Sequence, residues 1–190
     1  MYRFLSDLRG LVSFGIVLGA IFLSSSVFAE ELIDADRALK EIFPGEGSWE
    51  QQEVVLSEEQ IHLLEKIAAI SFDYEKPGKT MLYILKGEDR VLGYAFEDTV
   101  LGKWGPIHYV VGINDAGEVL RVIVLDYQEI RGRPVAKRRF LRQYEGKTAH
   151  DPVRLREDID GISGATISSR SLTDGIRKII NIFELKRDDL

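Results

Sequence analysis

The sequence predicts a single α+β domain, in which an antiparallel sheet of consecutive hairpins is packed with helices. Three observations predict this fold. Two pairs of short β-rich runs are each joined by turn residues, helical periodicities flank them, and the length of 190 residues suits one ordinary domain. With 45% hydrophobic and 29% charged residues, the chain can build a core and fits neither a disordered chain nor a polytopic membrane protein.

The first 29 residues are expected to be a secretory signal peptide outside this fold. Arg3 and Arg9 precede an uncharged run over 11–29, and small residues stand at positions −3 and −1 of a cut after Ala29. The alternative is an uncleaved membrane anchor, because the run reaches the length needed to cross a bilayer. Both interpretations export residues 30–190, to the periplasm or to the outer face of the cytoplasmic membrane.

Two helices are expected at the start of the exported part. Residues 32–43 place alanine, leucine and isoleucine along one stripe, and Pro44 and Gly45 end that pattern. Ser57 followed by Gln60 is typical of a capping box, which predicts a second helix directly afterwards.

Four strands and a last helix follow. The β-rich runs are 80–85, 91–96, 107–113 and 119–125, and glycine, aspartate and asparagine separate the members of each pair. The last helix is amphipathic, with apolar residues at spacings of three and four: Leu172, Ile176, Ile179, Ile180 and Phe183.

Composition excludes several classes of function. The chain has no cysteine, which excludes disulfides, thiolate metal sites, cysteine-ligated iron–sulfur clusters and cysteine nucleophiles. Its net charge of −6 makes it a poor nucleic-acid binder, so no nucleic-acid partner is expected. The three histidines, His62, His108 and His150, lack the spacing of metal ligands, and no metal site is expected.

The segment that carries chemistry lies between Asp158 and Thr173. It is rich in serine and threonine and contains Gly161 and Gly164, which allow close approach of the backbone to a ligand. Because the amphipathic helix is expected directly afterwards, its unpaired N–H groups would face this loop and could hold a phosphate. The alternative is an ordinary helix cap with spare hydroxyls, since serine and threonine are common at helix starts.

The string from Asp160 to Thr166, Asp-Gly-Ile-Ser-Gly-Ala-Thr, resembles the D-G-x-[ST]-G-A-T signature of the exported FMN-binding domain family. Members include the C subunit of the sodium-pumping NADH:quinone oxidoreductase, the G subunit of the Rnf complex and the regulators of nitrous-oxide reductase. The resemblance implies that a flavin transferase, with FAD as donor, esterifies Thr166 to the phosphate of FMN. It also implies that Ser163, Gly164, Ala165 and Asp160 surround this phosphoester.

Two further stretches strengthen the resemblance, which covers the chain from about Leu82 onward. Residues 105–114 look like the central hairpin of the family, and 140–147 match its F-L-x-Q-[FY]-x-G-K run. Where large respiratory subunits carry E-T-P-G-L-G, this chain has a Y-x-E-x-R-G run, as in small stand-alone periplasmic members. The resemblance therefore adds three residues to the expected flavin site: Glu129, Arg131 and Gly132.

A basic stretch and two aromatic residues could also serve a flavin. Six basic residues and no acidic one lie in 130–144, either as a solvated face or as cations that stabilise a reduced flavin and attract an acidic partner. Trp104 and Tyr109 could stack on the flavin ring, although such residues more often belong to the core.

The expected function is therefore an exported electron-transfer flavoprotein with FMN linked covalently to Thr166, which passes electrons between redox partners such as a membrane complex or a cytochrome. No catalytic residue is assigned, because a carrier is favoured over a stand-alone enzyme. Two alternatives stay open: a flavin-dependent reductase of a quinone, metal or small organic acceptor, and a non-redox periplasmic binding or assembly module.

Overall fold

The structure is a computed structural model that describes most of the chain after the predicted export signal. The described residues are 32–45, 47–70, 72, 78–127 and 134–190. The predicted signal peptide, residues 1–29, and three expected site residues lie outside them: Glu129, Arg131 and Gly132.

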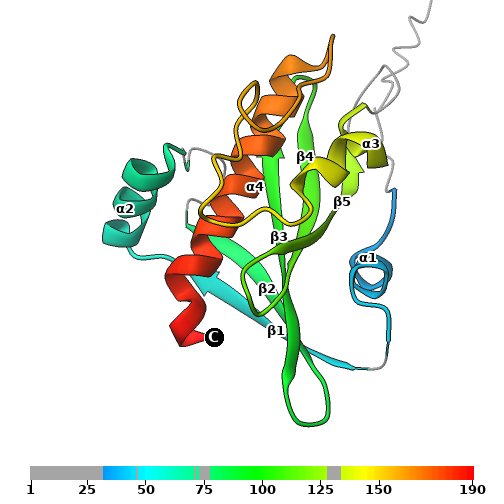
Figure 1. Cartoon of the computed structure of the whole chain (residues 1–190), viewed down its shortest axis with the longest axis vertical. Helices are drawn as coiled ribbons and strands as arrows, with labels where there is room; N and C mark the ends of the chain where they lie inside the picture. Colours follow the sequence, from blue (N-terminus) through cyan, green and yellow to red (C-terminus); the bar gives the residue numbers. More distant parts are fainter. Residues whose placement is uncertain (1–31, 46, 71, 73–77, 128–133) are drawn as a thin grey trace, which may run out of the picture.

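Five antiparallel strands form one sheet in sequence order (Figure 1). Each strand pairs with the next along the chain, as the predicted hairpins require. The strands are β1 (Ser48–Val55), β2 (Lys79–Lys86), β3 (Val91–Leu101), β4 (Pro106–Ile113) and β5 (Val119–Tyr127). The predicted α+β class and its four strands are confirmed.

The first strand, β1, was not predicted. Its sequence is rich in glutamate and glutamine, and only Val54 is buried along its eight residues. It lies at the edge of the sheet and pairs only with β2. Because an edge strand with solvent on both sides needs no apolar alternation, the sequence carries no strand signal there.

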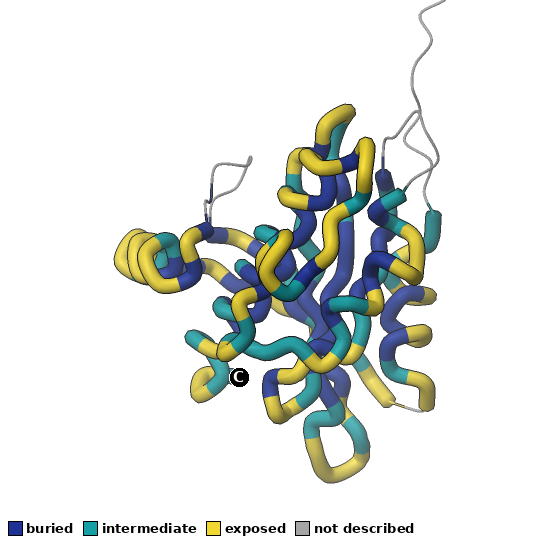
Figure 2. The backbone as a smooth tube through the Cα atoms, turned by 45° about the horizontal axis from the view of Figure 1, so that its top comes forward, coloured by how far each residue is buried: buried dark blue, intermediate teal, exposed yellow. Residues whose placement is uncertain are grey.

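Helices cover both faces of the sheet (Figure 1). Along β3, Phe96 belongs to the large core shared with α4 (Thr166–Lys186), whereas Ala95 belongs to a small core shared with α1 (Ala35–Ile42). Neighbouring residues of a strand point to opposite faces, so α4 and α1 lie on opposite sides. Figure 2 shows the buried backbone concentrated in the central strands and in α4.

Both predicted helices at the start of the domain are confirmed. Asp34 caps α1 by accepting a hydrogen bond from the backbone N–H of Arg37. The second helix, α2 (Glu58–Ala68), begins with the predicted capping box between Ser57 and Gln60. It packs beside α4.

A set of short helical turns continues the chain after β5. These turns are η1 (Pro134–Ala136), α3 (Arg138–Leu141) and η2 (Arg142–Tyr144), and η3 (Arg187–Asp189) ends the chain. Phe140, Leu141 and Tyr144 are buried in the large core, which fixes this basic segment beside β5 and the start of α4.

Helix α4 begins earlier than predicted. The apolar periodicity starts at Leu172, but the helix starts at Thr166, so the hydroxyl-rich run forms its first turns and is not a preceding loop. Among the described residues, no helix is long and apolar enough to cross a bilayer.

Candidate functional site

The site is built around the start of α4, which carries no side-chain cap. The residue before the helix is Ala165, and no side chain accepts a hydrogen bond from the first turn. The first hydrogen bond from a backbone N–H of this turn joins Ser169 to the carbonyl of Ala165. The N–H groups of Thr166, Ile167 and Ser168 therefore have no partner within the helix, and no acidic residue lies in this turn. The interpretation of this segment as an ordinary serine or threonine cap is wrong.

The hydroxyl groups of this segment divide into two sets. Ser168 and Ser169 are buried, and their side-chain oxygens accept hydrogen bonds from the backbone N–H groups of Lys103 at 3.2 Å and Ile162 at 3.4 Å. Ser163 and Thr166 are exposed. The buried set thus holds the loop in place, and the exposed set is available to a ligand.

Gly164 gives the loop its turn and leaves room beside it. Its φ is +82°, a left-handed conformation that strongly favours glycine, and a Cβ placed there would meet no atom within 4 Å. A ligand can therefore approach the backbone between Ser163 and Thr166.

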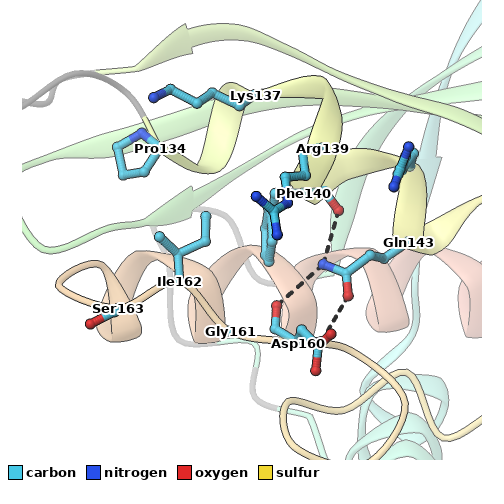
Figure 3. A pocket seen from close by; sticks show the side chains of 10 residues that line it. Pro134, Lys137, Arg139, Phe140, Gln143, Asp160, Gly161, Ile162 and Ser163 are labelled. Atoms are coloured by element: carbon cyan, nitrogen blue, oxygen red, sulfur yellow. Dashed lines mark hydrogen bonds between the residues drawn. The ribbon is translucent and has the colours of Figure 1, made fainter.

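Gln143 holds the signature loop by its backbone (Figure 3). Its side-chain amide accepts a hydrogen bond from the N–H of Asp160 at 2.8 Å and donates to the carbonyl of Asp160 at 3.2 Å. The same amide nitrogen lies 3.3 Å from the carbonyl of Phe140 in α3. One side chain thus joins α3 to the residue that opens the signature.

Lys147 and Asp158 form a second connection to this loop. Lys147 Nζ lies 2.8 Å from Asp158 Oδ2, and the Asp158 carboxylate accepts hydrogen bonds from the backbone N–H groups of Val153 and Arg154. Burial acts to raise the pKa of Asp158, but the Lys147 ammonium and the two N–H donors outweigh it and hold the pKa below its ordinary value. The hydrogen bond from Lys147 to Asp158 raises the pKa of Lys147. The expected role of Asp158 in shaping this turn is confirmed.

Val153, within this turn, has a strained backbone. Its φ is +45°, which is costly for a β-branched residue. Asp158 holds its N–H, and the buried Arg177 of α4 donates to its carbonyl at 2.9 Å. Arg177 also donates to the carbonyls of Ala68 and Ala69 at the end of α2. The turn before the signature is thus fixed to α2 and α4 together.

A pocket of about 490 Å³ lies between the α3 segment and the signature loop (Figure 3). That volume is within the range of about 300–1,000 Å³ typical of sites for small molecules and cofactors. Its walls combine apolar groups with three cations. The lining residues are Pro134, Lys137, Arg139, Phe140, Arg142, Gln143, Asp160, Gly161, Ile162 and Ser163.

The structure brings together the signature residues that the sequence predicts. Asp160 and Ser163 line the pocket, and Gly164, Ala165 and Thr166 lead directly from it into α4. Sequence reasoning missed the role of Gln143, although its place in the F-L-x-Q run was noticed. The signal was an amide in a position where the neighbouring residues Phe140, Leu141 and Tyr144 are all core.

The two aromatic candidates for ring stacking have different environments. Tyr109 is fully buried under α4 and donates to Asp98, so it belongs to the core. Trp104 is 52% exposed in the β3–β4 turn, next to Lys103, whose backbone bonds to Ser168. Only Trp104 is accessible to a ligand. No group of three or more His, Asp or Glu side chains in the described part of the chain could hold a metal.

A meander sheet that presents a glycine-containing loop, an uncapped helix start and a cation-lined pocket defines an α+β ligand-binding domain. Residues 102–181 match the model of the FMN-binding domain, and the chain belongs to that family. The match covers β4, β5, the basic segment, the signature loop and most of α4.

A solved structure supports the same fold. NqrC from Shewanella oneidensis superposes with a TM-score of 0.55 at 15% sequence identity, covering 79% of this chain and 86% of that chain. A second solved protein, the NqrC counterpart in the Na⁺-translocating NADH-quinone reductase from Parabacteroides distasonis, gives a lower TM-score of 0.42 at 16% identity, covering 68% and 77%. No curated protein sequence matches this chain.

Proposed function

We propose that the protein is an exported electron-transfer flavoprotein that carries FMN in phosphoester linkage to Thr166. One observation carries the proposal: within a match to the FMN-binding domain, Thr166 is an exposed hydroxyl at the first position of a 21-residue helix that no side chain caps. Unpaired N–H groups and the positive end of the helix dipole favour a phosphate at this position.

The residues of the site suit this group. Gly164 leaves open space beside the backbone, no carboxylate competes in the first turn of α4, and the adjoining pocket has an apolar floor and cationic walls. FMN supplies reversible electron transfer through its ring, while the chain supplies attachment, orientation and electrostatics.

Attachment would follow a balanced phosphoryl-transfer step. The Thr166 oxygen bonds to the flavin-side phosphorus of FAD, the pyrophosphate bond breaks, AMP leaves and the threonine proton is lost. A flavin transferase is the partner for this step. A membrane electron-transport complex or a cytochrome is the partner for electron transfer, and association with the membrane fits an export signal that remains attached.

The test replaces the acceptor. We expect Thr166→Val, produced together with a flavin transferase, to fold normally and to lack both the FMN mass increment and in-gel flavin fluorescence after denaturation. Ser163→Ala is the matched control, since it removes the other exposed hydroxyl, and it should keep the increment. Flavin still bound covalently to Thr166→Val would overturn the assignment. The same intact-mass measurement on the wild type reports whether the chain is cut after Ala29.

A further inference from the structure

The pocket beside the signature loop has a composition that differs from that of the helix start. Phe140 and Ile162 supply apolar surface, and Lys137, Arg139 and Arg142 supply three positive charges. This combination suits a flat, largely apolar group with an anionic edge better than it suits a bare phosphate. The phosphate already has its own donors at the start of α4.

The cations of the pocket lack acidic partners. In the described part of the chain, none of the three forms a salt bridge, whereas the neighbouring Arg138 pairs with Glu145 at 2.5 Å. Figure 3 shows the Arg139 side chain over the middle of the pocket, between Ile162 and Asp160, and Lys137 extending along the rim. An unpaired guanidinium in this position is available to a ligand.

The pocket lies within reach of the proposed attachment point. Ser163 lines the pocket and is three residues before Thr166, and the intervening Gly164 allows the backbone to turn. A flavin tethered by its phosphate at Thr166 can therefore extend its ring back over the signature loop.

We propose that this pocket receives the isoalloxazine ring of FMN and that Arg139 raises the redox potential of the flavin by stabilising the negative charge of its reduced form. The inference rests on the proposed function. Its physical basis is that a fixed cation beside a group that becomes negative on reduction favours the reduced state.

The experiment compares two adjacent arginines in the flavin-loaded full-length protein. We expect Arg139→Gln to weaken stabilisation of the reduced flavin about tenfold, which lowers the two-electron midpoint potential by about 30 mV. Arg138→Gln removes the same charge from the side chain that pairs with Glu145, and it should leave the potential nearly unchanged. Arg139→Lys should restore most of the wild-type potential, because it restores the charge. The measurement is a spectroelectrochemical titration, with circular dichroism to verify folding.

Three outcomes would overturn the inference. The first is an unchanged potential in Arg139→Gln with flavin attached, and the second is an equal shift in Arg138→Gln. The third is a flavin absorbance spectrum that changes in Trp104→Phe but not in Arg139→Gln, which would place the ring on the β3–β4 turn. Failure of the proposed function is distinguishable, because the wild-type protein would then lack the FMN mass increment.

Discussion

Two consecutive carboxylates on β3, Glu97 and Asp98, point to opposite faces of the sheet, and each binds a tyrosine hydroxyl and a basic side chain. On the α1 face, Glu97 accepts from Tyr83 at 2.6 Å and bonds to His108 at 2.8 Å. This group of three is called the Glu97 cluster.

On the α4 face, Asp98 accepts from Tyr109 at 3.0 Å and pairs with Lys178 at 2.5 Å. This group is called the Asp98 cluster. Gly175 of α4 makes room for it, because a Cβ there would lie 2.4 Å from the Tyr109 hydroxyl oxygen.

The difference between the clusters lies in burial and in the choice of base. The side chains of Asp98 and Lys178 are 10% and 14% exposed, against 20% and 36% for Glu97 and His108. Lysine stays charged over the physiological range, whereas histidine titrates within it. The helix that carries Thr166 is therefore attached to the sheet by an ion pair that is insensitive to pH, and the face away from the flavin site carries the sensitive pair.

Breaking the Asp98 cluster should have the largest effect. Lys178→Met leaves a nearly buried carboxylate without its cation, and we expect a loss of about 3 kcal/mol in the free energy of unfolding. In the double variant Asp98→Asn/Lys178→Met, most of this loss should be recovered, because no buried charge is left unpaired. Urea unfolding measures both. Equal losses in the single and double variants would show that packing, and not charge, dominates.

The two tyrosines provide a matched test of burial. Tyr109→Phe removes a fully buried donor to a carboxylate, and we expect it to cost about 2 kcal/mol. Tyr83→Phe removes the shorter bond on the more exposed face and should cost about 1 kcal/mol. Chemical denaturation compares them. The reverse order would mean that bond length outweighs burial.

The smallest effect should depend on pH. Its hydrogen bond to Glu97 raises the pKa of His108 above 6.5, and the same bond lowers the pKa of Glu97 below 4.5. The raised histidine pKa gives a stabilisation that is present below pH 6.5 and is lost as pH rises through the folded pKa. The lowered glutamate pKa gives one that is present above pH 4.5 and is lost as pH falls through the folded value. The pair therefore contributes most between about pH 4.5 and 6.5.

We expect His108→Gln to cost about 0.5 kcal/mol at pH 6 and close to nothing at pH 9. Unfolding curves at the two pH values measure this difference. Lys178→Met is the control, because its cost should be the same at both. A constant cost for His108→Gln would show that its role is only steric.

Much of the fold could be predicted from the sequence, because most elements carry a local pattern. The helix before the sheet has its apolar stripe, the capping box of Ser57 and Gln60 is local, and four strands are β-rich between turn residues. The start of α4 could not be placed from periodicity, because Ser168 and Ser169 are buried through hydrogen bonds and not through apolarity.

The candidate site could be predicted only in part. The signature from Asp160 to Thr166 is contiguous in sequence, and so a resemblance can find it. Gln143 acts on main-chain atoms 17 residues away, which no side-chain pattern reveals. The same limit applies to Tyr109, which the sequence cannot assign to core or surface until the position of α4 is known.

The contacts of Arg177 have a consequence for the order of folding. Arg177 bonds to carbonyls 109 and 108 residues earlier in the chain, and Ser168 bonds to a backbone N–H 65 residues earlier. Helix α4 can form from local contacts, but the loop before it takes its shape only after these distant segments have met, which is a slow step because of loop-closure entropy. A transferase that recognises the loop in this conformation would act only on chains that have completed folding.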